Sequence, residues 1–257
     1  MLRATIWIVI LGLLMVGMAL LLVRPAVAAA CPRCFGLSKA ADGVYVESAM
    51  SPATRAHTAG VMSAAEQSIA TFFGEERFKP RTLICSTDGC YHRIGGAPGS
   101  GTGTLGSFAL VVSPEAVNKV AVTEALAHVE LRGRVGAWKM EMGAVPEWFE
   151  EGLAVVVADD PLFIKPPSHV DRCLAGSFPD MPATPSEWRD ELEQEGDVLY
   201  AQSACQTVMW IQSHGGPPGV AALLGKLADG QPFDTLYREG VADSRGAQAA
   251  ASSSVKR

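Results

Sequence analysis

The N-terminus carries the feature that most constrains this chain, an uncharged apolar stretch of 20 residues from Ala4 to Val23, preceded by Arg3. A run of about 18 or more apolar residues is long enough to span a bilayer. With Arg3 kept on the cytoplasmic side, the remainder of the chain lies outside the cytoplasm. We therefore expect the rest to fold as an extracytoplasmic, periplasmic domain.

Two readings of this N-terminal stretch remain open. Its length favours a retained anchor, since the apolar core of a cleaved signal is about 7 to 15 residues long. The run from Ala26 to Ala28 has the A-x-A pattern that is typical of a signal peptidase site. Residues 1–30 are thus a membrane anchor or a signal peptide. The first reading gives a single-pass protein of the cell membrane, and the second gives a secreted protein.

The composition predicts one globular domain over residues 31–240. The chain has 257 residues, of which 48% are hydrophobic, and this suits one core once the termini are set aside. A net charge of −6, with no Lys/Arg cluster beyond scattered pairs, argues against a nucleic-acid partner. Residues 241–257 are rich in Ala and Ser without apolar periodicity, which predicts a disordered tail.

The six cysteines suit an oxidising compartment, because every one can find a partner. The pairs that we expect are Cys31–Cys34, Cys85–Cys90 and Cys173–Cys205. The CPRC segment at Cys31 also matches a redox pair, but that reading requires a thioredoxin-like βαβ context, and the sequence predicts none after it. We expect a local structural disulfide there, and a lipid-modified N-terminal Cys31 is the weaker alternative.

The pattern of apolar residues predicts an α+β protein. In the N-terminal half, strands at 43–47, 81–86 and 107–113 alternate with a helix at 54–73. The second half is expected to be helical, at 114–135, 146–158, 198–213, 218–228 and 232–238. Gly101, Gly103 and Gly106 match G-x-G-x-x-G, but a dinucleotide site needs a strand before this motif and a helix after it. We expect a flexible loop at these glycines.

The helix at 114–135 carries two polar side chains on its core-facing side. Glu124 and His128 share the face of its apolar residues and lie about 6 Å apart along the axis, so they can converge on one metal ion or on each other. A plain hydrogen bond between these two residues is the alternative. The opposite face carries Glu130 with Arg134, an i,i+4 pair that we expect to face water.

The helix at 146–158 is apolar nearly all round, yet three glutamates crowd its first turns. Glu147 and Glu150 suit the positive end of the helix dipole. Glu151 precedes Gly152, whose missing side chain lets another backbone or a metal site come close.

These residues resemble the gluzincin zinc metallopeptidases, especially the compact bacterial peptidase MA-like domains. That family carries HExxH on one helix and W-F-x-E-G-L-A on the next. The second segment is matched here by Trp148, Phe149, Glu151, Gly152, Leu153 and Ala154. The resemblance covers about residues 110–240 and implies a zincin-like metallopeptidase fold, with a small N-terminal mixed sheet and helices before a mainly helical C-terminal half. It makes Glu151 the counterpart of the third zinc ligand.

The first family motif is broken in this chain. Aligning His128 with the second motif histidine turns HExxH into EALAH, with Glu124 at a ligand position and Ala125 in place of the catalytic base. Alanine cannot take a proton from a metal-bound water. Glu124 is one residue away, about 100° around the helix from the base position. The remaining set of Glu124, His128 and Glu151 would hold zinc less well than the family's two-histidine set.

Three hypotheses follow. The first is a gluzincin-like domain with lost or weakened peptidase activity that binds a peptide or protein. The second is an active metal-dependent peptide hydrolase, in which Glu124 or an acid from another segment is the base and His128 and Glu151 position metal and water. By family resemblance, Tyr200 would stabilise the oxyanion. The third is a structural helical domain in which Glu124, His128 and Arg132 form a buried polar network. A Glu151 carboxylate within a few ångströms of His128 would favour the first two.

Overall fold

The structure is a computed structural model that describes residues 24–174, 176 and 180–238. The apolar stretch at 4–23 and the tail at 241–257 lie outside the described residues. The chain divides into two compact units. Unit 1 comprises residues 1–62 and 79–122, and unit 2 comprises residues 63–78 and 123–257. No helix within the described residues is long and apolar enough to cross a bilayer.

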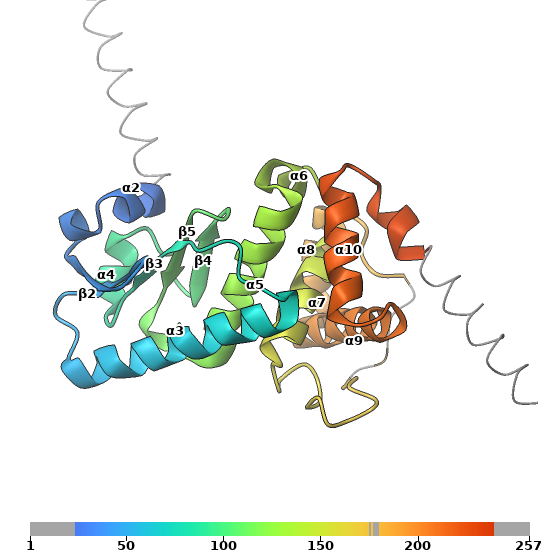
Figure 1. Ribbon diagram of the computed structural model, residues 1–257, viewed down its shortest axis with the longest axis horizontal. Coiled ribbons are helices and arrows are strands. Elements are labelled where there is room, and N and C mark those ends of the chain that lie inside the picture. The colour runs from blue at the N-terminus through green and yellow to red at the C-terminus, as the bar shows by residue number, and fades with distance from the viewer. Residues whose placement is uncertain (1–23, 175, 177–179, 239–257) are drawn as a thin grey trace, which may run out of the picture. The chain divides into compact units, whose positions relative to one another are not determined.

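Unit 1 is built on a mixed sheet of five strands in the order β1-β2-β3-β5-β4 (Figure 1). The central pairs β2–β3 and β3–β5 are parallel, and the outer pairs β1–β2 and β4–β5 are antiparallel. The strands are β1 (Leu37–Ala41), β2 (Val44–Glu47), β3 (Arg81–Ile84), β4 (Thr102–Leu105) and β5 (Ala109–Val112). The helices are α2 (Arg24–Ala30), the first part of α3 (Pro52–Phe73), α4 (Asp88–Arg93) and 3-10 turns at Pro32–Phe35 and Pro114–Ala116.

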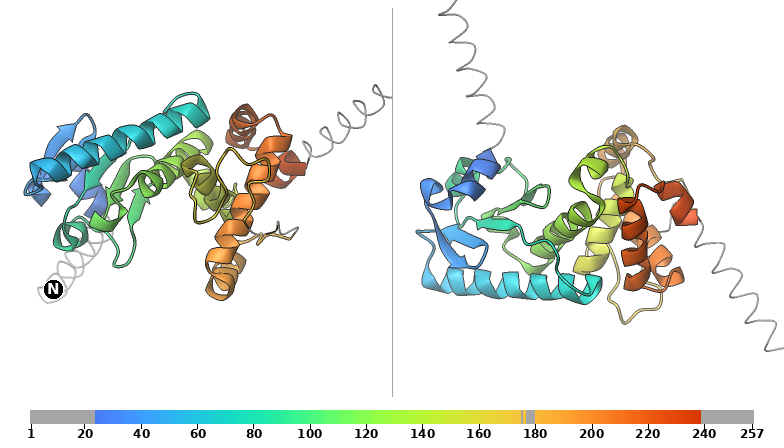
Figure 2. Two further views of the ribbon diagram at one scale, coloured as in Figure 1. Left: turned by 90° about the horizontal axis from the view of Figure 1, so that it is seen from below. Right: turned by 45° about the horizontal axis from the view of Figure 1, so that its top comes forward.

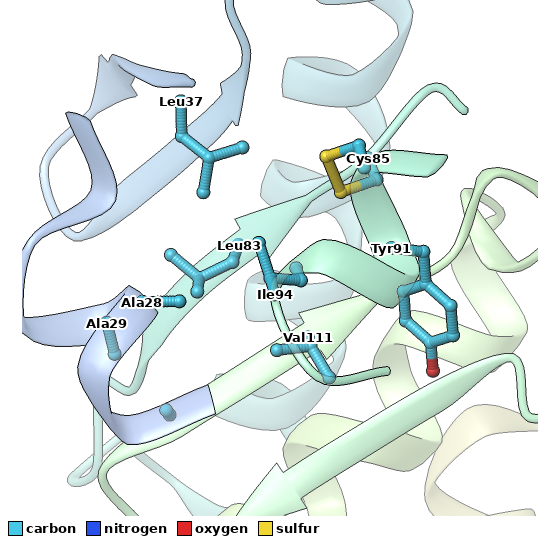
Figure 3. Packing of buried hydrophobic residues seen from close by; sticks show 10 residues of the cluster. Ala28, Ala29, Leu37, Leu83, Cys85, Tyr91, Ile94 and Val111 are labelled. Carbon is cyan, nitrogen blue, oxygen red and sulfur yellow. A yellow bond between two sulfur atoms is a disulfide. The ribbon is translucent and has the colours of Figure 1, made fainter. Parts of the chain in front are cut away.

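The core of unit 1 includes helix α2, which lies within the stretch that we assigned to targeting. Ala28 and Ala29 are fully buried and pack with Leu83, Ile94 and Val111 (Figure 3). Arg81 Nη1 donates a hydrogen bond of 2.6 Å to the Ala29 carbonyl oxygen. The folded unit therefore begins before Cys31.

Unit 2 is helical. It contains α5 (Lys119–Val135) from Thr123 onward, α6 (Ala137–Glu141), α7 (Glu147–Ala158), α8 (Pro185–Glu195), α9 (Asp197–Ser213) and α10 (Pro217–Ala228), followed by helical residues 233–238. Helix α7 is buried along most of its length, as its composition predicts. It packs against α9 (Figure 2, yellow-green and orange). The coarse expectation of a mixed sheet followed by helices is confirmed.

Two local expectations were wrong. Thr102–Leu105 forms β4 rather than a flexible loop, and Gly106, with φ of 53°, lies in the turn that leads to β5. The glycine-rich sequence does not predict a strand here, but backbone pairing with β5 stabilises one. Glu130 is fully buried rather than facing water, because its carboxylate accepts hydrogen bonds from the backbone N–H groups of Arg77 and Phe78.

The three expected disulfides, Cys31–Cys34, Cys85–Cys90 and Cys173–Cys205, are all present. Their presence is consistent with an oxidising compartment. Asp88 and Gly89, between the second pair, belong to the short helix α4.

Candidate functional site

The candidate site lies in unit 2, where α5 and α7 bring their polar side chains together. Helix α5 presents Glu124, His128 and Arg132 at intervals of four residues, so they share one face. Helix α7 begins after Pro146, and its first turns place Glu147, Glu150 and Glu151.

His128 lies between two carboxylates of α7. Its Nδ1 is 2.9 Å from Glu150 Oε1, and its Nε2 is 3.6 Å from Glu151 Oε2. Burial by itself lowers the pKa of His128, but the charge of Glu151 and the hydrogen bonds to both carboxylates outweigh it and raise that pKa to about 10. In this arrangement His128 is an imidazolium at neutral pH; its Nδ1 donates a hydrogen bond to Glu150, and its Nε2 forms a longer ion pair with Glu151.

Glu150 is the carboxylate that joins the two helices. It is 8% exposed, and its Oε1 also accepts a hydrogen bond of 3.0 Å from Arg132 Nε. Burial raises the pKa of Glu150, but the hydrogen bond and charge of His128, with the charge of Arg132, overcome this and lower it. Arg132 also lies 3.5 Å from Glu141 on α6. A buried carboxylate with two cationic partners is stable as an ion.

Glu124 has a different partner from the one that the sequence suggested. Its carboxyl group is hydrogen-bonded to that of Asp160, which lies just after α7 and is itself buried. Burial and the negative charge of Asp160 raise the pKa of Glu124 to about 7. Near neutral pH, Glu124 is therefore partly protonated.

Tyr200, on α9, is near these carboxylates. Burial and the charges of Glu151 and Glu124 raise the pKa of its phenol to about 12, so the hydroxyl stays protonated. Its ring packs against Phe163 and Trp188, with centroids 5.4 and 5.7 Å away.

The predicted ligand set of Glu124, His128 and Glu151 is only partly assembled. His128 and Glu151 face each other, while Glu124 is engaged with Asp160. Within residues 24–174, 176 and 180–238, no three His, Cys, Asp or Glu side chains are grouped so that they could hold a metal ion. As placed, the side chains do not fit a three-ligand site. Ala125, which the resemblance to gluzincins would put at the position of the catalytic base, is 2% exposed.

Sequence reasoning missed two members of this cluster. Glu150 had been explained by the helix dipole alone, yet it binds both His128 and Arg132. No sequence pattern pointed to Asp160, apart from its position just after a buried helix. The network that we considered as the structural alternative exists in part, with Glu150 as the acceptor and with Glu124 outside it.

Unit 2 also contains a cleft of about 770 Å³. Its lining includes Trp148 from the W-F-x-E-G-L-A segment, together with Pro146, Met181, Phe233 and Tyr237. Asp180 and Asp234 add negative charge at its wall, and Lys139 and Arg238 add positive charge. The lining thus combines aromatic and charged side chains.

The chain was compared with models of protein families, with curated proteins and with solved structures, and none of them matches it.

Proposed function

We propose that this protein is an extracytoplasmic, gluzincin-like domain of zincin fold that has lost peptidase activity and binds a peptide or protein ligand. The observation that carries the proposal is the position of His128 and Glu151, whose Nε2 and Oε2 atoms face each other at 3.6 Å. In the family these would be two of the three zinc ligands. The base position holds the buried Ala125, which has no group to accept a proton.

The remaining contacts of the site support loss of activity rather than a different metal chemistry. His128 can bind a metal only as a neutral imidazole, but its carboxylate partners stabilise the charged form. Glu124 is paired with Asp160. The proton that His128 carries in this arrangement must leave before a metal ion can bind between His128 and Glu151. The aromatic cleft offers a binding surface for a peptide.

The first experiment measures the metal content of the purified full chain, in wild type and in His128→Ala, by mass spectrometry. The proposal expects wild type to contain well under one equivalent of metal. Near-stoichiometric metal that disappears in His128→Ala would contradict it and would point to an altered but working site.

A gain-of-binding variant tests the placement of the ligands. Glu124→His supplies the missing histidine and leaves Ala125 unchanged. It should raise zinc affinity at least about tenfold, because zinc prefers imidazole nitrogen as a ligand in such sites. Glu193→His adds a histidine at an exposed position of α8 and is the matched control. If folded Glu124→His binds zinc no better than this control, Glu151 is not the counterpart of the third ligand.

A working hydrolase remains the second candidate, because the pKa of Glu124 is raised to about 7 and a general base is most effective when its pKa is close to the operating pH. Under this alternative, zinc or another divalent ion would be held by His128 and Glu151. Cleavage of a peptide library that is abolished by a chelator and by Glu124→Gln would favour the hydrolase. Chelator-sensitive cleavage that persists in Glu124→Gln would exclude Glu124 as the base.

A further inference from the structure

The CPRC segment holds the most accessible disulfide of unit 1. Cys34 is exposed and Cys31 is half-buried, on the 3-10 turn Pro32–Phe35 between α2 and β1. The other disulfide of this unit, Cys85–Cys90, is inside the core, with its two residues 0% and 1% exposed. A thiol from another molecule can therefore reach Cys34 without any opening of the fold.

The segment around this disulfide is held by other contacts. The backbone N–H of Cys31 donates to the Val27 carbonyl oxygen, and that of Cys34 donates to the Cys31 carbonyl oxygen, at 2.9 and 3.0 Å. Before the turn, Ala28 and Ala29 are fully buried in the core of unit 1. After it, Leu37 is buried in the same core. With a separation of three residues, the bond also constrains the unfolded chain very little. We therefore expect the fold to persist when this bond is reduced.

Three arginines lie around this disulfide, and one of them, Arg93, also acts on the carboxylate of Glu47. Arg33 lies between the two cysteines and is exposed. Arg81 Nη1 lies 3.4 Å from the carbonyl oxygen of Ala30, the residue before Cys31. Arg93 Nη2 lies 3.7 Å from the place that a β-carbon on Gly36 would take, two residues after Cys34. Positive charge favours the thiolate form in which a cysteine attacks or leaves.

The structure also changes the context of the motif. We expected no βαβ element after CPRC, but β2, α3 and β3 form one, with the two strands parallel. The cysteines precede this element rather than lying between its strand and its helix. The argument for reactivity therefore rests on the exposure and charge of the pair itself.

We propose that Cys31–Cys34 is a thiol–disulfide exchange site for protein dithiols outside the cytoplasm. A thiolate of the dithiol attacks Cys34 Sγ and forms a mixed disulfide, while the Cys31–Cys34 bond breaks and its electron pair goes to Cys31 Sγ. The second thiol of the partner loses its proton and attacks the partner's own sulfur in the mixed disulfide, which releases Cys34. The partner is oxidised by two electrons, and Cys31 and Cys34 are reduced and take up the two protons.

The experiment follows reduction of the full chain by dithiothreitol, with alkylation of free thiols and mass spectrometry of each cysteine peptide. Cys85–Cys90 and Cys173–Cys205 serve as internal controls. Cys31–Cys34 should open at least about tenfold faster than either control, because the rate of exchange depends on access to the sulfur and on the pKa of the leaving thiol. The circular dichroism spectrum should stay unchanged. Equal or slower opening of Cys31–Cys34, or opening that coincides with loss of the fold, would overturn the proposal.

Single substitutions test the assigned roles. Cys31→Ser leaves Cys34 as the free thiol. This variant should form a mixed disulfide with oxidised glutathione several-fold faster than Cys34→Ser does, because Cys34 is the more exposed residue. Arg33→Ser should slow reduction of the wild-type pair about threefold, whereas Lys226→Ser, which removes an exposed charge from α10, should not. A faster Cys34→Ser would overturn the assignment of Cys34 as the attacked atom, and equal rates for Arg33→Ser and Lys226→Ser would overturn the role of charge.

Discussion

The buried carboxylate of Glu130 accepts hydrogen bonds from three residues of unit 2. Its Oε1 accepts hydrogen bonds of 2.6 and 2.7 Å from the N–H groups of Arg77 and Phe78, and its Oε2 accepts one of 2.7 Å from Arg134 Nε. The Arg134 guanidinium also lies 4.9 Å from the centre of the Phe73 ring. The carboxylate thus holds residues 77 and 78 of unit 2 against α5, and its charge is fully compensated.

Glu130→Ala should destabilise the protein by about 3 to 5 kcal/mol, because it leaves buried N–H donors and a nearly buried guanidinium without their acceptor. Denaturant unfolding measures this loss. Glu193→Ala, at an exposed position of α8, should change stability by no more than about 0.5 kcal/mol. Equal effects of the two substitutions would mean that the contacts of Glu130 contribute nothing net.

His128 should make stability fall in mildly alkaline solution. The pKa of His128 is about 10 in the folded protein and 6.5 in the unfolded chain. Well below pH 6.5 the imidazole is protonated in both states, and its ion pairs contribute fully to the stability of the folded protein. As the pH rises toward 10, the unfolded chain loses that proton first, and the free energy of unfolding should decrease by a few kcal/mol at most.

Denaturant unfolding between about pH 7.5 and 9.5 tests this, a range above the window in which Glu124 titrates. His128→Gln should be less stable than wild type near pH 7 and should show a much flatter pH dependence. A slope in His128→Gln as steep as in wild type would show that other groups cause the decline.

At the scale of elements, the packing of α7 on α9 depends on Gly152. A β-carbon at this position would lie 2.4 Å from the Ser203 carbonyl oxygen and 2.4 Å from Thr207 Oγ1. The sequence left two roles open for this glycine, close approach of another backbone and close approach of a metal site. The structure assigns it the first. The same approach fixes Glu151, the preceding residue, opposite His128.

Gly152→Ala should destabilise unit 2 by about 2 to 3 kcal/mol, because the added methyl group forces the two helices apart. Gly225→Ala is the matched control, since this glycine lies within α10 with no atom within 4 Å of the added carbon. There alanine should raise stability by about 0.5 to 1 kcal/mol through its helix propensity. Thermal unfolding of both variants measures the contrast, and a neutral Gly152→Ala would refute the close packing.

For the whole molecule, the buried face of α2 bears on the fate of the N-terminus. Cleavage after Ala28 would remove most of a helix whose Ala28 and Ala29 belong to the core of unit 1. We predict that the mature protein keeps residues 24–30, which agrees with a retained anchor. The mass of the protein isolated from its native membrane tests this, and an N-terminus at Ala29 or Cys31 would contradict it.

A truncation series gives the energetic counterpart. A chain that begins at Arg24 should unfold with the stability of the full chain. One that begins at Cys31 should lose about 2 to 4 kcal/mol, from two buried side chains and the Arg81 hydrogen bond to Ala29. Equal stability of the two truncated chains would show that α2 is not part of the folded unit.

The sequence determined the features that depend on neighbouring residues. The period of the apolar residues predicted most of α5, and the apolar run after Pro146 predicted α7. The short spacing of the first four cysteines predicted two disulfides, which left Cys173 and Cys205 as the third pair. Helical geometry alone placed Glu124 and His128 on one face of α5. These inferences hold because helix periodicity and short loops are local properties of the chain.

Tertiary structure alone decided which partner each charged group has. Glu150 joins His128 rather than serving the helix dipole alone, Glu124 turns to Asp160, and Glu130 is buried beneath residues 77 and 78. The burial of α2 and the pairing of β4 with β5 are likewise contacts between distant segments. Local propensity carries no information about such contacts, because they depend on which surfaces meet when the chain folds.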